Sequence, residues 1–319
     1  MISENRAAAA RGLEGSSSGF AGAWVVRYRP AVLTVGRYQI VSVVTGWFRL
    51  DGGAMFGVVP KIVWGGREDV DESNRILMTT RTLLAVDADA GRVIIVDTGC
   101  GPKWTAKDAE RYAIRPDPAA LPAALARFGL TEGDVTDVIV THLHFDHNGG
   151  LTEWVDQPSG PTRLRFPAAR HWLHADHWRH AHAPTPKDRA SFLTEDFEAL
   201  EGFDGLTLIE GDPPPPSLPN VGWLISNGHT RAQLLPRFDG EGGPLLWTGD
   251  VIPTVSHLPI PWVMAYDLYP LTTMEEKTRM LQRCRDDGLK LAFPHDRKVA
   301  GAVINWRGDK PSIAETLEL

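Results

Sequence analysis

The sequence feature that most restricts the fold is a cluster of histidines and a carboxylate directly after a short β-branched segment. Residues 136–140 (TDVIV) predict a buried strand, and the pattern His-x-His-x-Asp-His follows over residues 142–147. His142 and His144 are two residues apart, so an extended backbone points both side chains to the same side. Such a group of nitrogen and oxygen donors suits a divalent metal ion such as zinc.

Three further candidate ligands each follow a predicted strand in the second half of the chain. His229 follows a strand predicted at residues 221–225, and Asp250 and His295 follow strands in the same way. Because an α/β sheet gathers distant residues along one edge, we expect these side chains to join the first cluster.

The order of predicted elements indicates an α/β fold. Residues 82–86 and 92–96 predict a hairpin, and residues 118–128 and 273–287 predict helices. Further strands are predicted at residues 207–209, 221–225, 233–238, 245–247, 290–293 and 299–304. Since strands and helices recur in both halves, we expect two β-rich halves packed together with helices outside.

The chain offers no clear boundary between domains. Residues 1–22 are rich in Ala, Gly and Ser and predict a flexible N-terminal arm, and residues 23–319 predict a single domain.

Composition restricts the partners and the compartment. With 33 Lys and Arg against 40 Asp and Glu, the formal charge is −7, which gives no electrostatic case for nucleic acid or anionic membranes. No apolar run approaches the roughly 20 residues that a membrane span needs. Two cysteines cannot form a disulfide framework, and the N-terminus lacks the apolar core of a secretory signal. We therefore expect a cytoplasmic protein with a small-molecule substrate.

Taken together, these motifs resemble the metallo-β-lactamase superfamily over residues 38–306. The segment Val96-Asp97-Thr98-Gly99 is similar to the strand-end motif that precedes the metal loop in that family. The resemblance implies a four-layer αβ/βα sandwich with a binuclear metal centre at the sheet edge. Its first metal would be held by His142, His144 and His229, and its second by Asp146, His147 and His295, with Asp250 bridging.

The resemblance also implies a mechanism. Two cations about 3.5–4 Å apart can share one water and lower its pKa toward about 7. We therefore expect hydrolysis by a metal-bridging hydroxide, with Asp146 handling the proton and Asp97 orienting the metal loop through hydrogen bonds. Zinc is the first candidate metal, and manganese, iron and cobalt are alternatives.

Within the superfamily, residues 50–60 (LDGGAMFGVVP) are similar to a loop of the lactonase and organophosphate-hydrolase branch. We expect Met55 and Phe56 to close over an apolar group of a lactone or carboxylic ester. Many lactonases of this branch carry a Tyr where this chain has Pro253. His257, Tyr266 or Tyr269 is therefore expected to take its place at the substrate, with His257 and Tyr266 as the first candidates.

Two alternatives to a lactonase or esterase stay open. One is a phosphotriesterase or other phosphoester hydrolase of the same fold, and the other is a non-catalytic, metal-stabilised binding protein. A homodimer is expected from the resemblance only.

A second group of histidines lies outside the ligand set. Its members, which recur about every three residues, are His171, His174, His177, His180 and His182. Such spacing predicts an amphipathic surface helix. It does not predict a second metal site, because five ligands so placed drift around a helix and cannot converge on one ion.

Overall fold

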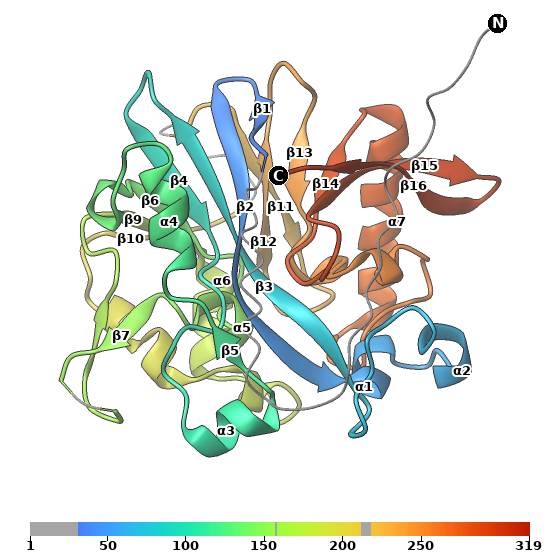
Figure 1. The fold of residues 1–319 in the computed structure, drawn as a ribbon, viewed down its shortest axis with the longest axis horizontal. Coiled ribbons are helices and arrows are strands. Elements are labelled where there is room, and N and C mark those ends of the chain that lie inside the picture. The colour runs from blue at the N-terminus through green and yellow to red at the C-terminus, as the bar shows by residue number, and fades with distance from the viewer. Residues whose placement is uncertain (1–30, 157, 212–217) are drawn as a thin grey trace, which may run out of the picture.

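Two β-sheets lie face to face at the centre of the computed structural model, with helices on their outer sides (Figure 1). The structure describes residues 31–156, 158–211 and 218–319. The predicted arm at residues 1–22 lies outside these ranges. Within them, no helix combines the length and the apolar character needed to cross a bilayer.

The first sheet has the order β1-β2-β3-β4-β6-β9-β10, and β5 pairs with β2. Its strands are β1 (Leu33–Val35), β2 (Tyr38–Asp51), β3 (Arg75–Asp87), β4 (Arg92–Val96), β5 (Arg115–Pro116), β6 (Asp137–Ile139), β9 (Arg170–His174) and β10 (Leu206–Ile209). Strands β4, β6, β9 and β10 are parallel neighbours, so their carboxyl ends share one edge.

The second sheet has the order β11-β12-β13-β14-β15-β16. Its strands are β11 (Val221–Ser226), β12 (Gln233–Phe238), β13 (Leu245–Trp247), β14 (Lys290–Ala292), β15 (Gly301–Arg307) and β16 (Lys310–Leu317). A separate hairpin is formed by β7 (Thr152–Trp154) and β8 (Thr162–Leu164). The backbone N–H of Leu234 donates to the carbonyl of Thr141 at 2.9 Å and so joins the two sheets beside the metal loop.

The described residues form seven α-helices. They are α1 (Gly52–Phe56), α2 (Lys61–Trp64), α3 (Ala106–Arg111), α4 (Ala120–Ala126), α5 (Phe145–Asn148), α6 (Ala175–His182) and α7 (Pro270–Asp286). Short 3₁₀ turns lie at η1 (Glu132–Asp134), η2 (Arg189–Ser191), η3 (Thr194–Asp196), η4 (Glu198–Leu200), η5 (Gly249–Val251) and η6 (Val255–His257). Figure 1 shows α4 on the outer side of the first sheet and α7 on that of the second.

The hydrophobic core is divided by the sheets into layers. One cluster fills the space between the sheets and includes Tyr38, Ile94 and Trp247. A second cluster packs α4 and α6 on the first sheet, and a third packs α7 on the second sheet through Met280 and Leu281. This is the expected four-layer sandwich of the metallo-β-lactamase fold.

Most predicted elements are confirmed, and one is corrected. The hairpin at residues 82–86 and 92–96 is the end of β3 with β4. The predicted surface helix at residues 171–182 is wrong in its first part, because residues up to His174 form β9 between β6 and β10. The strands that are not predicted from the sequence include β1, β2, β5, β7, β8 and β16.

Candidate metal centre

The seven predicted ligands come together in two adjacent groups at the shared sheet edge. In each group, the candidate ligand atoms lie within 4.8 Å of one another. The groups are His142, His144 and His229, and Asp146, His147, Asp250 and His295. All seven residues are at most 8% exposed, so the site is removed from bulk water.

Asp97 holds the metal loop, residues 141–150, in place. Its carboxylate accepts the backbone N–H of Thr141 at 2.9 Å and the Thr141 hydroxyl at 3.0 Å. It also accepts Nδ1–H of His147 and Nε1–H of Trp247, each at 3.0 Å. Asp97 therefore bonds to the start of the metal loop, to one candidate ligand and to the second sheet.

Fixed acceptors decide which nitrogen of each ring faces the site. Nδ1 of His295 lies 2.9 Å from the carbonyl oxygen of Thr79, and Nδ1 of His229 lies 3.0 Å from Oδ1 of Asp267. Because each partner only accepts, Nδ1 must carry the proton in both rings. Nε2 of each ring then faces the other ligands, as it does in His147.

The ring nitrogens that face the site lie close together, in an arrangement that suits a cation. Nε2 of His147 lies 3.0 Å from Nε2 of His295, and Nε2 of His229 lies 3.1 Å from Nδ1 of His144. In the described part of the chain, Nε2 of His142 is buried with no hydrogen-bond partner. Paired acceptor nitrogens repel unless a proton or metal ion lies near them, so the donor set fits divalent cations.

Asp250 lies between the two groups. Its Oδ1 is 3.2 Å from Nε2 of both His147 and His295, and its Oδ2 is 3.3 Å from Nε2 of His229. Burial would raise the pKa of this carboxyl, but the imidazoles outweigh burial and hold the pKa of Asp250 well below its usual value. An ionised carboxylate that reaches both groups is placed as a bridging ligand would be.

Met55 and Phe56, which are expected to close over an apolar group of the substrate, do not lie in an open loop. The segment forms helix α1, and these side chains are only 2% and 0% exposed. The Phe56 ring stacks on Trp64 and on His257, with centroids 4.9 and 4.7 Å apart. Both side chains belong to a hydrophobic cluster beneath the site surface.

His257 is also unsuited to contact a substrate. Its Nδ1 lies 2.8 Å from the Thr254 hydroxyl, and its Nε2 lies 2.8 Å from the carbonyl oxygen of Met55. Since both ring nitrogens are engaged and the ring is 1% exposed, its predicted role at the substrate is replaced by a structural one. The ring links η6 to α1.

Tyr266 is the remaining predicted substrate contact. Burial raises the pKa of Tyr266 to about 12, and the carboxylates of Asp51 and Asp146 raise it further in the same direction. Tyr266 packs against the hydrophobic cluster that contains Phe145 of the metal loop, and its phenol is protonated at neutral pH.

The second histidine group is largely buried rather than exposed. His171, His174 and His177 are at most 6% exposed, and none of the group belongs to the clusters able to hold a metal in the described residues. His180 lies 2.6 Å from Asp188 through Nε2. The predicted surface position is wrong for the first members of the group, because they are buried on and beside strand β9.

Sequence reasoning missed two neighbours of the ligands. Asp267 contacts His229, although only the aromatic residues beside it drew attention in the sequence. The side-chain amide of Gln233 lies 3.2 Å from Nδ1 of His142. Both contacts join residues distant in sequence, so no local pattern could reveal them.

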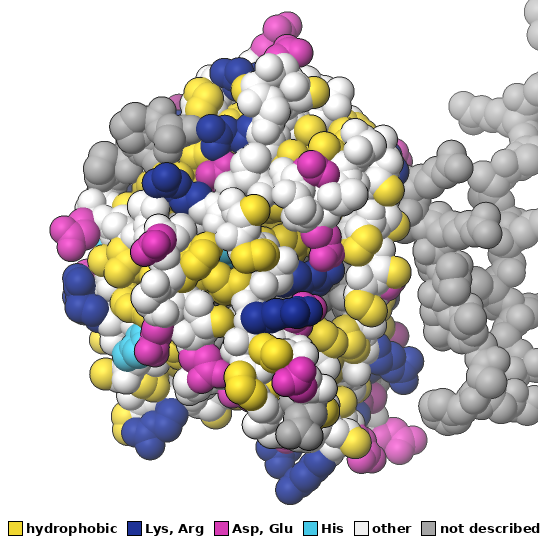
Figure 2. Space-filling model, turned by 90° about the vertical axis from the view of Figure 1, so that its left-hand side faces the viewer, with side chains coloured by type: hydrophobic (Ala, Val, Ile, Leu, Met, Phe, Trp, Pro, Cys, Tyr) yellow, Lys and Arg dark blue, Asp and Glu magenta, His cyan; other side chains and the backbone are white. Residues whose placement is uncertain are grey.

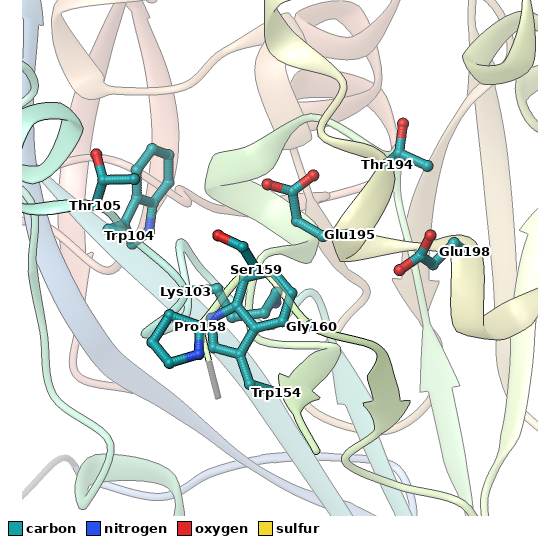
Figure 3. Close-up of a pocket in the computed structure, with 10 residues that line it drawn as sticks. All are labelled: Lys103, Trp104, Thr105, Trp154, Pro158, Ser159, Gly160, Thr194, Glu195 and Glu198. Atoms are coloured by element: carbon teal, nitrogen blue, oxygen red, sulfur yellow. The ribbon is translucent and has the colours of Figure 1, made fainter. Parts of the chain in front are cut away.

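A surface pocket of about 420 Å³ lies beside the metal loop (Figure 3). Lys103 in its lining donates to the carbonyl of Gly149 at 2.5 Å, and Trp104 packs on Phe145 with centroids 5.3 Å apart. None of the seven candidate ligands lines this pocket, so it is a neighbour of the metal centre. On the face drawn in Figure 2, basic and acidic side chains are interspersed with hydrophobic ones.

Comparison with known proteins gives the family. The model of the metallo-beta-lactamase superfamily matches residues 82–296, and the chain belongs to this superfamily. A search of curated proteins finds no match. A probable metal-dependent hydrolase from Staphylococcus aureus has a similar structure, with a TM-score of 0.80, 28% identity, and coverage of 90% of this chain and 99% of that chain.

Two more distant structures share the fold. AidC, a dizinc quorum-quenching lactonase solved with a homoserine product, has a TM-score of 0.72 at 16% identity and covers 90% of this chain and 98% of its own. The hydrolase AbOPH has a TM-score of 0.70 at 15% identity, with coverage of 89% and 96%. The superfamily and the staphylococcal neighbour indicate a metal-dependent hydrolase.

Proposed function

We propose that the protein is a binuclear metal-dependent hydrolase that cleaves a lactone or a carboxylic ester. The observation that carries this proposal is the convergence of imidazole Nε2 atoms from His147, His229 and His295 around the Asp250 carboxylate. Two divalent cations held by this set would supply an activated water and Lewis acidity toward a carbonyl oxygen. Zinc is the first candidate, since nitrogen and carboxylate donors suit it.

Asp146 is proposed to move the proton. Its Oδ2 lies 3.4 Å from Nε2 of His295, and its side chain is 9% exposed, against 1% for His147. A carboxylate at the edge of the site can take a proton from the attacking water and pass it to the leaving group.

Tyr266 is proposed to donate a hydrogen bond to the substrate carbonyl oxygen. It would supply the phenol hydroxyl that many lactonases of this branch carry on a Tyr at the position of Pro253. The raised pKa of Tyr266 keeps its proton on the phenol, as a donor to a developing oxyanion requires.

A substrate without a net negative charge fits the surroundings. Arg231, close to His229 in sequence, pairs with Asp176 at 3.3 Å and is 59% exposed, so its charge is directed to α6. Lactonases that share the fold were solved with homoserine products, which supports a lactone as the first class to test. A cytoplasmic location and a homodimer stay predictions.

The test is hydrolysis by metal-reconstituted protein of a homoserine lactone, an aryl ester and an aryl phosphotriester. We expect Asp146→Asn to lower lactone or ester kcat by about 100-fold or more at saturating metal. Tyr266→Phe should lower kcat while Tyr269→Phe, the matched control on an exposed neighbour, should not. Turnover of the phosphotriester alone would replace the proposal with a phosphotriesterase, and bound metal without any turnover would indicate a binding protein.

A further inference from the structure

His177 connects the two loops that carry the first group of ligands. It lies on α6, is 0% exposed, and its ring faces the metal loop. Its Nε2 accepts the backbone N–H of Leu143 at 2.8 Å. Its Nδ1 lies 2.7 Å from the carbonyl oxygen of Arg231.

The two partners fix the protonation of this ring. A backbone N–H can only donate, so Nε2 of His177 must present a lone pair to Leu143. A carbonyl can only accept, so Nδ1 must carry the proton toward Arg231. One neutral tautomer therefore satisfies both bonds at once.

The bonded backbone groups lie inside the ligand segments. Leu143 stands between His142 and His144, and Arg231 is two residues beyond His229. A change in the distance between Leu143 and Arg231 would therefore change the distance between the ligands on the two loops.

We propose that His177 is a positioning residue that sets the spacing between the His142–His144 segment and the His229 loop, and thereby the affinity of the first metal site. This inference rests on the proposed metal centre. It assigns a function to a histidine that binds no metal itself.

A purely packing role is the alternative. The Phe192 ring covers both His177 and His144, with centroids 5.8 and 4.8 Å away, so the imidazole is also part of a packed interior. The chain offers a matched histidine for comparison. His171 is equally buried and packs on Phe203, but its Nδ1 lies 3.1 Å from the carbonyl of Ala169, two residues away.

The experiment separates the two roles by measuring metal affinity. The probe is Co²⁺, titrated against a competing chelator, in a His295→Ala background that weakens the second group. His177→Phe keeps a ring of similar size without either bond, whereas His177→Gln keeps one donor and one acceptor. His171→Phe is the packing control.

We expect His177→Phe to weaken Co²⁺ binding by about 10- to 100-fold and His177→Gln by less than about threefold. His171→Phe should lower thermal stability without changing the affinity. In a His229→Ala background, which removes a ligand of the first group, His177→Phe should have little further effect.

Three outcomes would overturn the inference: unchanged affinity in His177→Phe, an equal loss in Phe and Gln variants, or an equal loss in His171→Phe. A flat Co²⁺ titration of the unsubstituted protein would instead refute the proposed metal centre. If His177→Phe does not fold, a ¹⁵N–¹⁵N scalar coupling across the Leu143 N–H···Nε2 bond tests the bridge in the unsubstituted protein. Absence of that coupling would refute it.

Discussion

Replacing Asp97 by Asn tests how the metal loop is held. One carboxylate oxygen accepts the N–H of Thr141, and the other accepts three donors, from Thr141, His147 and Trp247. An Asn oxygen at the three-donor position loses the first bond, worth about 1.5 kcal/mol, and weakens the other three by about 1 kcal/mol each. We therefore expect the free energy of unfolding of the metal-free protein to fall by about 4 kcal/mol, a large share of a typical total of about 5–15 kcal/mol.

Asn is the informative replacement because Asp97 has φ 57°, a conformation that Asn tolerates well. The change in stability then reports hydrogen bonds and not backbone strain. Asp137→Asn is the matched control, since Asp137 is also buried and accepts an indole N–H from Trp172, but at the opposite end of β6.

Two assays are needed for this pair of variants. Urea unfolding of the metal-free proteins should show a loss of stability in both. Chelator competition should show weaker metal binding, by about 10- to 100-fold, only in Asp97→Asn. A stability loss below about 1 kcal/mol in Asp97→Asn, or equal metal affinity in the two variants, would refute the reasoning.

Three further predictions follow from the same contacts. Removal of metal by a chelator should lower the thermal midpoint, and re-addition at about 1,000 times Kd should restore about 4 kcal/mol. Gly101 has φ 61°, and a Cβ there would lie 2.1 Å from the carbonyl oxygen of Gly149. Gly129 has φ 72° but open space around it, so Gly129→Ala should cost only the roughly 1–2 kcal/mol of the left-handed backbone. Gly101→Ala should therefore destabilise the protein by more than Gly129→Ala, as measured by urea unfolding. Burial lowers the pKa of Lys277 to about 7, although Asp267 opposes it. Between pH 7 and the ordinary lysine pKa of 10.5, the unfolded chain then binds more protons than the folded one. The free energy of unfolding should therefore rise with pH in that window, and Lys277→Met should flatten this rise when it is measured by urea titration.

The positions of the candidate metal ligands could be predicted because each depends on a local signal. A short apolar strand followed by a polar residue places that residue at a strand end, and parallel strands bring such ends to one edge. His229, Asp250 and His295 were found in this way, although each alone is a weak signal. Together with the His-x-His-x-Asp-His pattern of residues 142–147, these three residues predict one metal site much more strongly than any of them does alone.

The supporting contacts could not be predicted because they depend on tertiary packing. His171 and His177 lie on one regular spacing, yet pairing with β6 and β10 makes the first part of the segment a strand. Met55 and Phe56 resemble a flexible loop in sequence, but they lie in a short buried helix in which Phe56 stacks on the distant His257. In both cases long-range packing outweighs the local pattern.

The contacts that orient the ligands cross between the sheets in both directions. His295 follows β14 in the second sheet, and its Nδ1 lies against the carbonyl of Thr79 on β3 of the first. His147 lies on α5, in the loop that follows β6 of the first sheet, and Asp97 links it to Trp247 on β13 of the second. Ligand geometry therefore depends on how the two sheets pack. For this reason metal binding should stabilise the whole sandwich against unfolding, and both sheets should unfold in a single transition at a higher temperature when metal is bound.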